Sequence, residues 1–95
     1  MIRVLIERHI AESLESHYRD VARRILQSAV QAPGFISGES LHNLMDPNHC
    51  VIWSTWRSAN DWQNWLESDQ RKSMMQELGP LLDKEEKFTL LEHGG

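Results

Sequence analysis

Hydrophobic and polar residues alternate at the start of the chain. Ile2, Val4 and Ile6 are separated by single residues, and Leu5 is the one position that breaks the polar side of the pattern. A period of two residues is typical of a β-strand. The pattern therefore predicts a strand over Ile2–Ile10 that is partly buried on both of its faces.

The segment Leu14–Val30 has the period of a helix instead. Its hydrophobic residues recur at three- and four-residue steps, and charged residues occupy the opposite side. This is the pattern of an amphipathic helix that packs on one side. Ser13 is the predicted N-cap. Proline does not continue a helix and disfavours helical geometry in the residue before it, so we expect a turn at Pro33-Gly34.

The next two segments predict a hairpin. Residues of alternating character fill Phe35–Leu44, and the segment Cys50–Trp56 is rich in the β-branched and aromatic residues that favour strands. The sequence Asp46-Pro47-Asn48 between them is a turn signal. We therefore expect two antiparallel strands that are connected at residues 46–48.

A second helical region follows the hairpin. The pattern Ser58-x-x-Asp61 resembles a capping box, which marks the start of a helix. We expect an interruption at Ser68 and a further helical piece over Gln70–Leu78 that stops at a Gly-Pro pair. Alternation over Glu86–Glu92 predicts a final strand.

The order of these elements is β-α-β-β-α-β, which is the ferredoxin-like α+β pattern. It implies a four-stranded antiparallel sheet with both helices on one face. At 95 residues, the chain is expected to form one domain over residues 1–95. Strand residues such as Leu5 and Trp53 put hydrophobic side chains on both faces of the sheet, and the helices cover only one face. We therefore expect a homodimer through the other sheet face.

Composition excludes several classes of function. The chain carries 10 Lys+Arg and 14 Asp+Glu, a formal net charge of −4, which argues against a nucleic-acid or anionic-membrane surface. Its single cysteine, Cys50, excludes an internal disulfide framework, and the scattered histidines lack metal-ligand spacing. No apolar run is long enough to span a bilayer and no signal-peptide pattern opens the chain, so we expect a cytoplasmic protein.

Two linked motifs carry a family resemblance. They are Ala32-Pro-Gly-Phe35-x-x-Gly38-Glu39 and Val51-x-x-x-x-Trp56-x-Ser58-x-x-x-Trp62-x-x-Trp65-x-x-Ser68. Together they resemble the antibiotic biosynthesis monooxygenase family over nearly the whole chain. The resemblance implies a dimeric α+β barrel. The family includes cofactor-free oxygenases of aromatic polyketides and quinols, haem-degrading monooxygenases, and members without established activity, and fold alone does not decide among them.

Five residues are candidates for a site. Trp62 and Trp65 lie one helical turn apart, and they serve either as core residues or as a flat wall for a planar ligand. Met75 is the third candidate for binding this ligand. His42 and His49 flank the hairpin turn. A neutral imidazole can take a proton from a phenol or quinol near pH 7, although histidines at the end of a hairpin are often surface residues.

Haem is disfavoured by two departures from the haem-degrading members. The resemblance implies a tryptophan at the position of Trp65, a histidine iron ligand in the next helix and an asparagine in the first strand. This chain has Met75 near the ligand position and Glu7 near the asparagine position, and methionine ligation is associated with electron transfer. Glu7 and Glu39 could serve as cavity acids only if they face the helices.

The leading interpretation is a cofactor-independent monooxygenase of a small aromatic or quinol, with no cofactor and no metal. A phosphate-binding glycine loop is absent from the sequence, so no dinucleotide is expected. The alternatives are a non-catalytic dimeric small-ligand-binding module and a haem-binding or haem-degrading monooxygenase.

Overall fold

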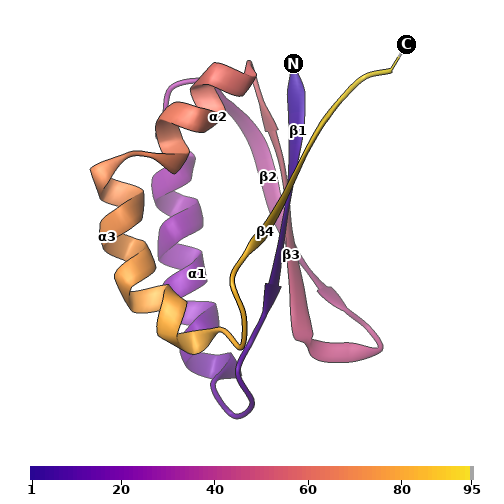
Figure 1. The fold of residues 1–95 in the computed structure, drawn as a ribbon, viewed down its shortest axis with the longest axis vertical. Coiled ribbons are helices and arrows are strands. Elements are labelled where there is room, and N and C mark those ends of the chain that lie inside the picture. The colour runs from indigo at the N-terminus through magenta and orange to yellow at the C-terminus, as the bar shows by residue number, and fades with distance from the viewer. Residues whose placement is uncertain (95) are drawn as a thin grey trace.

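The computed structural model describes residues 1–94. The elements are β1 (Ile2–His9), α1 (Glu15–Ala29), β2 (Phe35–Asn43), β3 (Asp46–Trp56), α2 (Ala59–Leu66), α3 (Asp69–Leu78), a 3₁₀ turn (Gly79–Leu81) and β4 (Lys87–Glu92). The strands form one antiparallel sheet in the order β2-β3-β1-β4, and the three helices lie against one face of it (Figure 1). The ferredoxin-like fold is thus confirmed. In the described part of the chain, no helix combines the length and the apolar character needed to cross a membrane.

The core lies between the helices and the inner strands. Ile2, Val4 and Ile6 of β1 are buried beneath the helices, and the stripe Tyr18, Val21, Ile25 and Ala29 of α1 is buried against them. Both sets follow the periods that the sequence predicts. Burial of these side chains is the main stabilising contribution to a domain of this size.

A chain of aromatic rings crosses the core. The ring centroids of Phe35 and Trp56 are 5.3 Å apart, those of Trp56 and Trp62 are 5.6 Å apart, and those of Trp62 and Phe88 are 5.7 Å apart. All three contacts are edge-on, which is a favourable arrangement for ring quadrupoles. The rings connect β2, β3, α2 and β4.

The second helical region consists of two helices, and each begins at a serine. The Ser58 hydroxyl accepts the backbone N–H of Asp61 at 3.1 Å, and the Ser68 hydroxyl accepts that of Arg71 at 3.2 Å. The predicted helix start at Ser58 and the predicted interruption near Ser68 are both confirmed. Each cap satisfies an N–H that has no partner inside its helix.

Gly34 makes the turn from α1 into β2. It adopts a φ of 86°, in the region that side chains disfavour. A Cβ atom at this position would lie 2.4 Å from the Cβ of Asp61 in α2. The turn and the close approach of α2 therefore both require a glycine.

Two predicted boundaries are wrong. Ser13 is not the N-cap of α1, because Leu14 takes that position and Ser13 turns the chain with a φ of 73°. The hairpin turns at residues 44–45 and not at 46–48, because Asn43 pairs with Asp46. The side chain of Asn43 stabilises this tighter turn by accepting the N–H of Met45 at 2.8 Å.

The sheet face away from the helices has no cover in the described chain (Figure 1). Leu5 pairs with Trp53 across β1 and β3 on this face, and both side chains are half-buried. Trp56 lies on the opposite, helix-covered face and is 1% exposed. Trp53 and Trp56 therefore lie on different faces of the sheet. We call this uncovered surface the open face.

Candidate functional site

A small cavity lies between the helices and the sheet. Its wall is formed by the indole rings of Trp56, Trp62 and Trp65 together with aliphatic side chains of α1, β1 and β3. The volume is about 30 Å³, which is room for a water molecule and not for an aromatic ring. An aromatic ligand can enter only if a neighbouring segment moves outward. The predicted wall residues Trp62 and Trp65 do come together here.

Polar atoms enter this cavity from two arginines. Arg8 occupies a position of β1 in phase with Ile6, so its side chain lies under the helices and is 2% exposed. Arg71 reaches the same cavity from α3 and is 6% exposed. Arginine rarely occupies a fully buried position without a partner. The partner of both guanidinium groups is Glu86, which precedes β4.

The three side chains form one ion-pair network, the Arg8–Glu86–Arg71 cluster. Arg8 Nε donates to Glu86 Oε2 at 2.7 Å, and Arg71 Nη2 donates to Glu86 Oε1 at 2.7 Å. Arg8 Nη1 also donates to the hydroxyl of Tyr18 at 3.3 Å. Each carboxylate oxygen therefore binds a different guanidinium group, and Glu86 fastens the chain before β4 to both β1 and α3.

The cluster leaves one positive charge in the core. Two guanidinium groups face one carboxylate, which gives 2 − 1 = +1. Burial would lower the pKa of Arg8, but its neighbours Tyr18 and Glu86 outweigh this effect and the pKa lies above its ordinary value. Burial raises the pKa of Tyr18 to about 12, so that its hydroxyl stays neutral at pH 7. An uncompensated buried charge is costly and favours the binding of an anion.

Two surface grooves adjoin the cavity. The α3–β4 groove measures about 530 Å³ and is lined by Arg71, Met75, Gly79, Leu82, Lys84, Glu85, Glu86 and Phe88. The α1–β3 groove measures about 440 Å³ and includes Tyr18, Cys50 and His42. Arg71 borders both the cavity and the α3–β4 groove. The cavity thus lies between two larger surface depressions.

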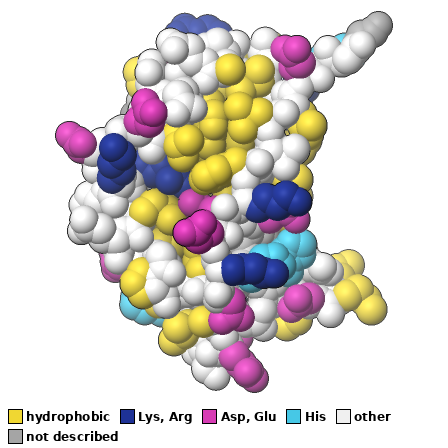
Figure 2. All heavy atoms as spheres, in the orientation of Figure 1, with side chains coloured by type: hydrophobic (Ala, Val, Ile, Leu, Met, Phe, Trp, Pro, Cys, Tyr) yellow, Lys and Arg dark blue, Asp and Glu magenta, His cyan; other side chains and the backbone are white. Residues whose placement is uncertain are grey.

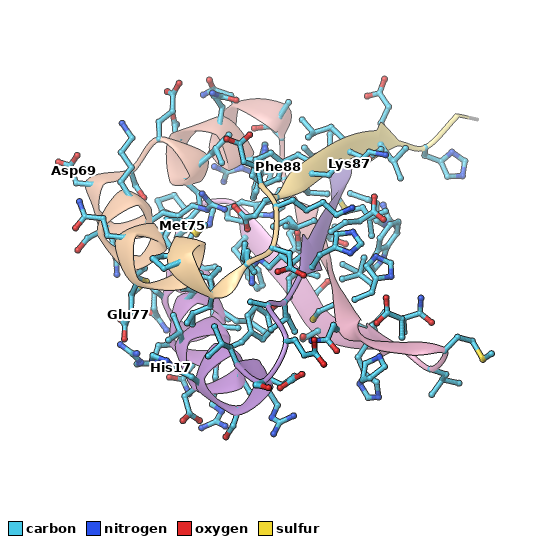
Figure 3. All side chains as sticks on the ribbon, turned by 60° about the horizontal axis from the view of Figure 1, so that its bottom comes forward. His17, Asp69, Met75, Glu77, Lys87 and Phe88 are labelled. Carbon is cyan, nitrogen blue, oxygen red and sulfur yellow. The ribbon has the colours of Figure 1, made fainter. Side chains whose placement is uncertain are left out.

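The α3–β4 groove lies on the face that Figure 2 presents. Hydrophobic side chains gather there over α2 and β4, and basic and acidic side chains lie next to them (Figure 2). Met75 comes from α3 and Phe88 from the start of β4, on facing elements (Figure 3). Met75 therefore belongs to this groove and is not part of the tryptophan-lined cavity.

The two candidate histidines lie on opposite faces of the sheet. His42 pairs with Cys50, whose side chain is buried beneath the helices, and it lines the α1–β3 groove. His49 pairs with His9 on the open face. The structure does not bring His42 and His49 together. Of the two, His42 is the one on the same side of the sheet as the cavity.

His49 has its own environment on the open face. Its ring stacks on that of His9 with centroids 4.7 Å apart, and its Nδ1 lies 3.1 Å from the side-chain nitrogen of Asn43. Its Nε2 is buried 3.4 Å from a Glu7 carboxylate oxygen and has no hydrogen-bond partner among the described residues. Glu7 and Glu39 both lie on this face, so neither is an acid of the cavity.

Sequence reasoning missed the two arginines that line the cavity, Arg8 and Arg71, and the glutamate that binds both of them, Glu86. The signal for Arg8 was present, because it continues the buried alternation of Ile2, Val4 and Ile6. Nothing local in the sequence marks Glu86 as its partner, since the two residues are 78 positions apart. Such a pairing emerges only once β1 and β4 are neighbours.

The residues around the cavity do not fit a haem. No histidine is among the described side chains that line either the cavity or the α3–β4 groove. Within residues 1–94, no group of three or more His, Cys, Asp or Glu side chains is arranged to hold a metal ion. We therefore derive no chemistry through haem.

Most of the chain is similar in sequence to curated proteins of Streptomyces. The chain is 27% identical over 79 residues to Protein SchA of Streptomyces halstedii, an alignment that covers 83% of this chain and 21% of that protein. It spans about a fifth of the length of the curated relatives that it matches.

Solved structures share the fold at low identity. A conserved protein from Methanosarcina mazei Go1 superposes with a TM-score of 0.88 at 18% identity, over 96% of this chain and 90% of that chain. SnoaB, described as a cofactor-independent oxygenase from Streptomyces nogalater, superposes with a TM-score of 0.85 at 15% identity, over 99% and 94%. The sequence profile of the antibiotic biosynthesis monooxygenase family matches residues 1–77, which is most of the chain. The chain therefore belongs to the antibiotic biosynthesis monooxygenase family.

Proposed function

We propose that this protein is a cofactor-independent monooxygenase that oxidises a small electron-rich aromatic, such as a phenol or quinol, between the helices and the sheet. The observation that carries the proposal is the position of two buried guanidinium groups, Arg8 and Arg71, beside an indole-lined cavity. The description of SnoaB, which has the same fold, supports it.

The proposed reaction uses the substrate as its own source of electrons. Loss of the phenol proton gives an anion, and a ring carbon of this anion forms a bond to O₂ while an electron pair moves to oxygen. The peroxide takes up a proton, and loss of water and of the ring hydrogen leaves a carbonyl. The products are a quinone and water, so no external reductant is needed.

The chain contributes electrostatics, orientation and a proton acceptor to this reaction. Arg8 and Arg71 stabilise the substrate anion in a site of low dielectric, where such stabilisation is strongest. Trp62 and Trp65 hold the ring. His42 in the adjoining α1–β3 groove is the candidate base, because it is on the side of the sheet that faces the helices.

Replacing His42 with Gln is expected to reduce kcat for quinol oxidation by about 100-fold, the usual contribution of a general base. His49→Gln is expected to leave the rate within about twofold, because His49 lies on the open face. Oxygen uptake with a panel of quinols and hydroxynaphthalenes measures both rates. His17→Gln, on the exposed side of α1, is the control. An unchanged rate in the His42/His49 double variant would remove the proposed base, and uptake no faster than the buffer blank across the panel would refute the oxygenase.

The small size of the cavity supports a second candidate, a non-catalytic dimeric module that binds a small ligand. A volume of about 30 Å³ is below that of an aromatic ring. Aromatic side chains that fill a core are explained by packing alone, without a catalytic role. The same measurements separate the two functions. A ligand that binds in calorimetry without any oxygen uptake supports the binding module.

We also propose that a second copy of the chain covers the open face. Leu5, Val51 and Trp53 are half-buried there, and Leu41 and Leu91 on the same face are 47% and 43% exposed. Contiguous apolar surface of this kind on a sheet marks an interface. An identical patch on both partners suits a two-fold dimer.

Trp53→Arg is expected to weaken dimerisation by about 100-fold, because it places a charge at the centre of an apolar interface. Sedimentation velocity at micromolar concentration measures the change. The control is Val30→Arg, since Val30 is 50% exposed beside the end of α1 and away from the open face. A native protein that sediments as a monodisperse monomer would contradict the proposed dimer.

A further inference from the structure

We infer that the Arg8–Glu86–Arg71 cluster is the binding site for an acidic group of the ligand, and that this ligand is an aromatic carboxylate. The inference rests on the proposed function only in placing the ligand beside the same cavity. It adds a property that oxidation of a phenol does not require, namely a permanent negative charge on the substrate at neutral pH.

The first argument is the supply of unused donors. A guanidinium group has five N–H donors in a planar fork that matches a carboxylate. Among the described residues, the side-chain hydrogen bond of Arg71 uses Nη2 alone, which donates to Glu86. The Arg71 side chain lines both the cavity and the α3–β4 groove. Glu86 already shows the geometry of carboxylate recognition at this place, with one oxygen on each arginine.

The second argument is charge. The cluster carries a net charge of +1, from two guanidinium groups and one carboxylate. A bound carboxylate would bring the site to zero, whereas a phosphate monoester with two negative charges would bring it to −1. At the rim of the groove, Lys84 and Glu85 are both exposed and their opposite charges cancel. The site therefore favours a carboxylate over a phosphate.

The third argument is the shape and lining of the groove. Its volume of about 530 Å³ is within the range of small-molecule sites. Met75 and Phe88 line it from facing elements (Figure 3), and a methionine side chain adapts readily to a planar ring. Phe88 packs on Trp62 with ring centroids 5.7 Å apart. Only the Phe88 side chain therefore lies between an aromatic ring in the groove and Trp62, which lines the cavity.

Isothermal titration calorimetry tests this inference with three probes of one ring system: 2-naphthoate, neutral 2-naphthamide and 2-naphthyl phosphate. We expect naphthoate to bind about 10- to 100-fold more tightly than naphthamide, the usual contribution of a charged hydrogen bond. Arg71→Gln is expected to abolish this preference, and Arg71→Lys to retain part of it. Lys72→Gln, an exposed neighbour on α3, is the control that removes the same charge outside the site.

Three results would overturn the inference. They are equal binding of naphthoate and naphthamide, tighter binding of naphthyl phosphate than of naphthoate, and absence of naphthoate binding at millimolar concentration. All three are measured on the native protein, so the inference stays testable if Arg71→Gln does not fold. Near-UV circular dichroism reports whether that variant is folded. A folded Arg71→Gln that keeps the preference for naphthoate would also contradict the site.

Oxygen uptake separates this inference from the proposed function. Tight binding of naphthoate with no oxygen uptake from hydroxynaphthoates would leave the carboxylate site standing and refute the oxygenase. Oxidation of neutral naphthols with the same KM as their carboxylated counterparts would support the oxygenase and refute the carboxylate site.

Discussion

Glu86→Gln is expected to lower the free energy of unfolding by about 3–5 kcal/mol, the usual cost of breaking a buried ion pair from one side. The substitution is nearly isosteric, so the packing is preserved while the negative charge is lost. Arg8 and Arg71 then share the core without a counter-ion, at side-chain exposures of 3% and 7%. Equilibrium unfolding in urea at pH 7 measures the loss.

The matched control for Glu86→Gln is Glu77→Gln. Glu77 accepts from Arg24 at 2.8 Å, nearly the distance of the Glu86 pairs, but the side chains of this pair are 54% and 45% exposed. Exposed pairs are screened by water and contribute little, so no measurable change in the urea midpoint is expected. Equal urea midpoints for the two variants would show that burial does not increase the contribution of the Glu86 ion pairs to the free energy of unfolding.

Local signals in the sequence were sufficient for most of the fold. The serines at positions 58 and 68 each begin a helix, because a serine cap depends only on the next three residues. The opposite orientations of Trp53 and Trp56 follow from the period of a strand. Gly34 has the positive φ that a turn before a strand requires.

The placement of the histidines depended on a feature that local signals do not determine, namely the register of the hairpin. The sequence Asp46-Pro47-Asn48 is a strong turn signal, yet these residues belong to β3 and the chain turns at 44–45. The register of β2 and β3 is irregular between His42 and Asn43. Since each step of register exchanges the two faces of a strand, periodicity alone did not separate His42 from His49.

The buried cluster was missed for a different reason. A charged residue in a strand is usually solvated, and Arg8 lies between two other polar residues, Glu7 and His9. Its burial depends on Glu86 and on Arg71, which reach it from the chain before β4 and from α3. Polar sites assembled from distant segments are where sequence reasoning is expected to fail, because function and not local structure explains them.

The same cluster also fixes the shape of the α3–β4 groove. Glu86 holds the segment before β4 against β1 and α3, and this segment lines the α3–β4 groove. An anion that binds the unused donors of Arg71 leaves both of these contacts in place. The cluster that is inferred to bind the ligand therefore also holds the groove in one shape.

Trp62→Ala is expected to lower the free energy of unfolding by about 3–5 kcal/mol, as large-to-small changes of buried aromatic residues do. Trp62 is 1% exposed and is the middle ring between Trp56 and Phe88, so its loss removes two edge-on contacts and leaves a cavity beside them. Urea unfolding measures the change. Trp53→Ala, on the open face, is the control, and it is expected to destabilise the isolated monomer less because Trp53 is only half-buried.

A second measurement on Trp62→Ala tells whether the tryptophan wall can hold a planar ligand. The substitution enlarges an existing cavity of about 30 Å³ that is lined mainly by apolar side chains, and apolar cavities of sufficient size bind small aromatic molecules. Added indole is therefore expected to raise the Tm of this variant and to leave that of the native protein unchanged, because a ligand that binds only the folded state stabilises it. An unchanged Tm in the variant would mean that α2 collapses into the space. Trp62 would then act as a core residue, and the ligand wall would depend on Trp65.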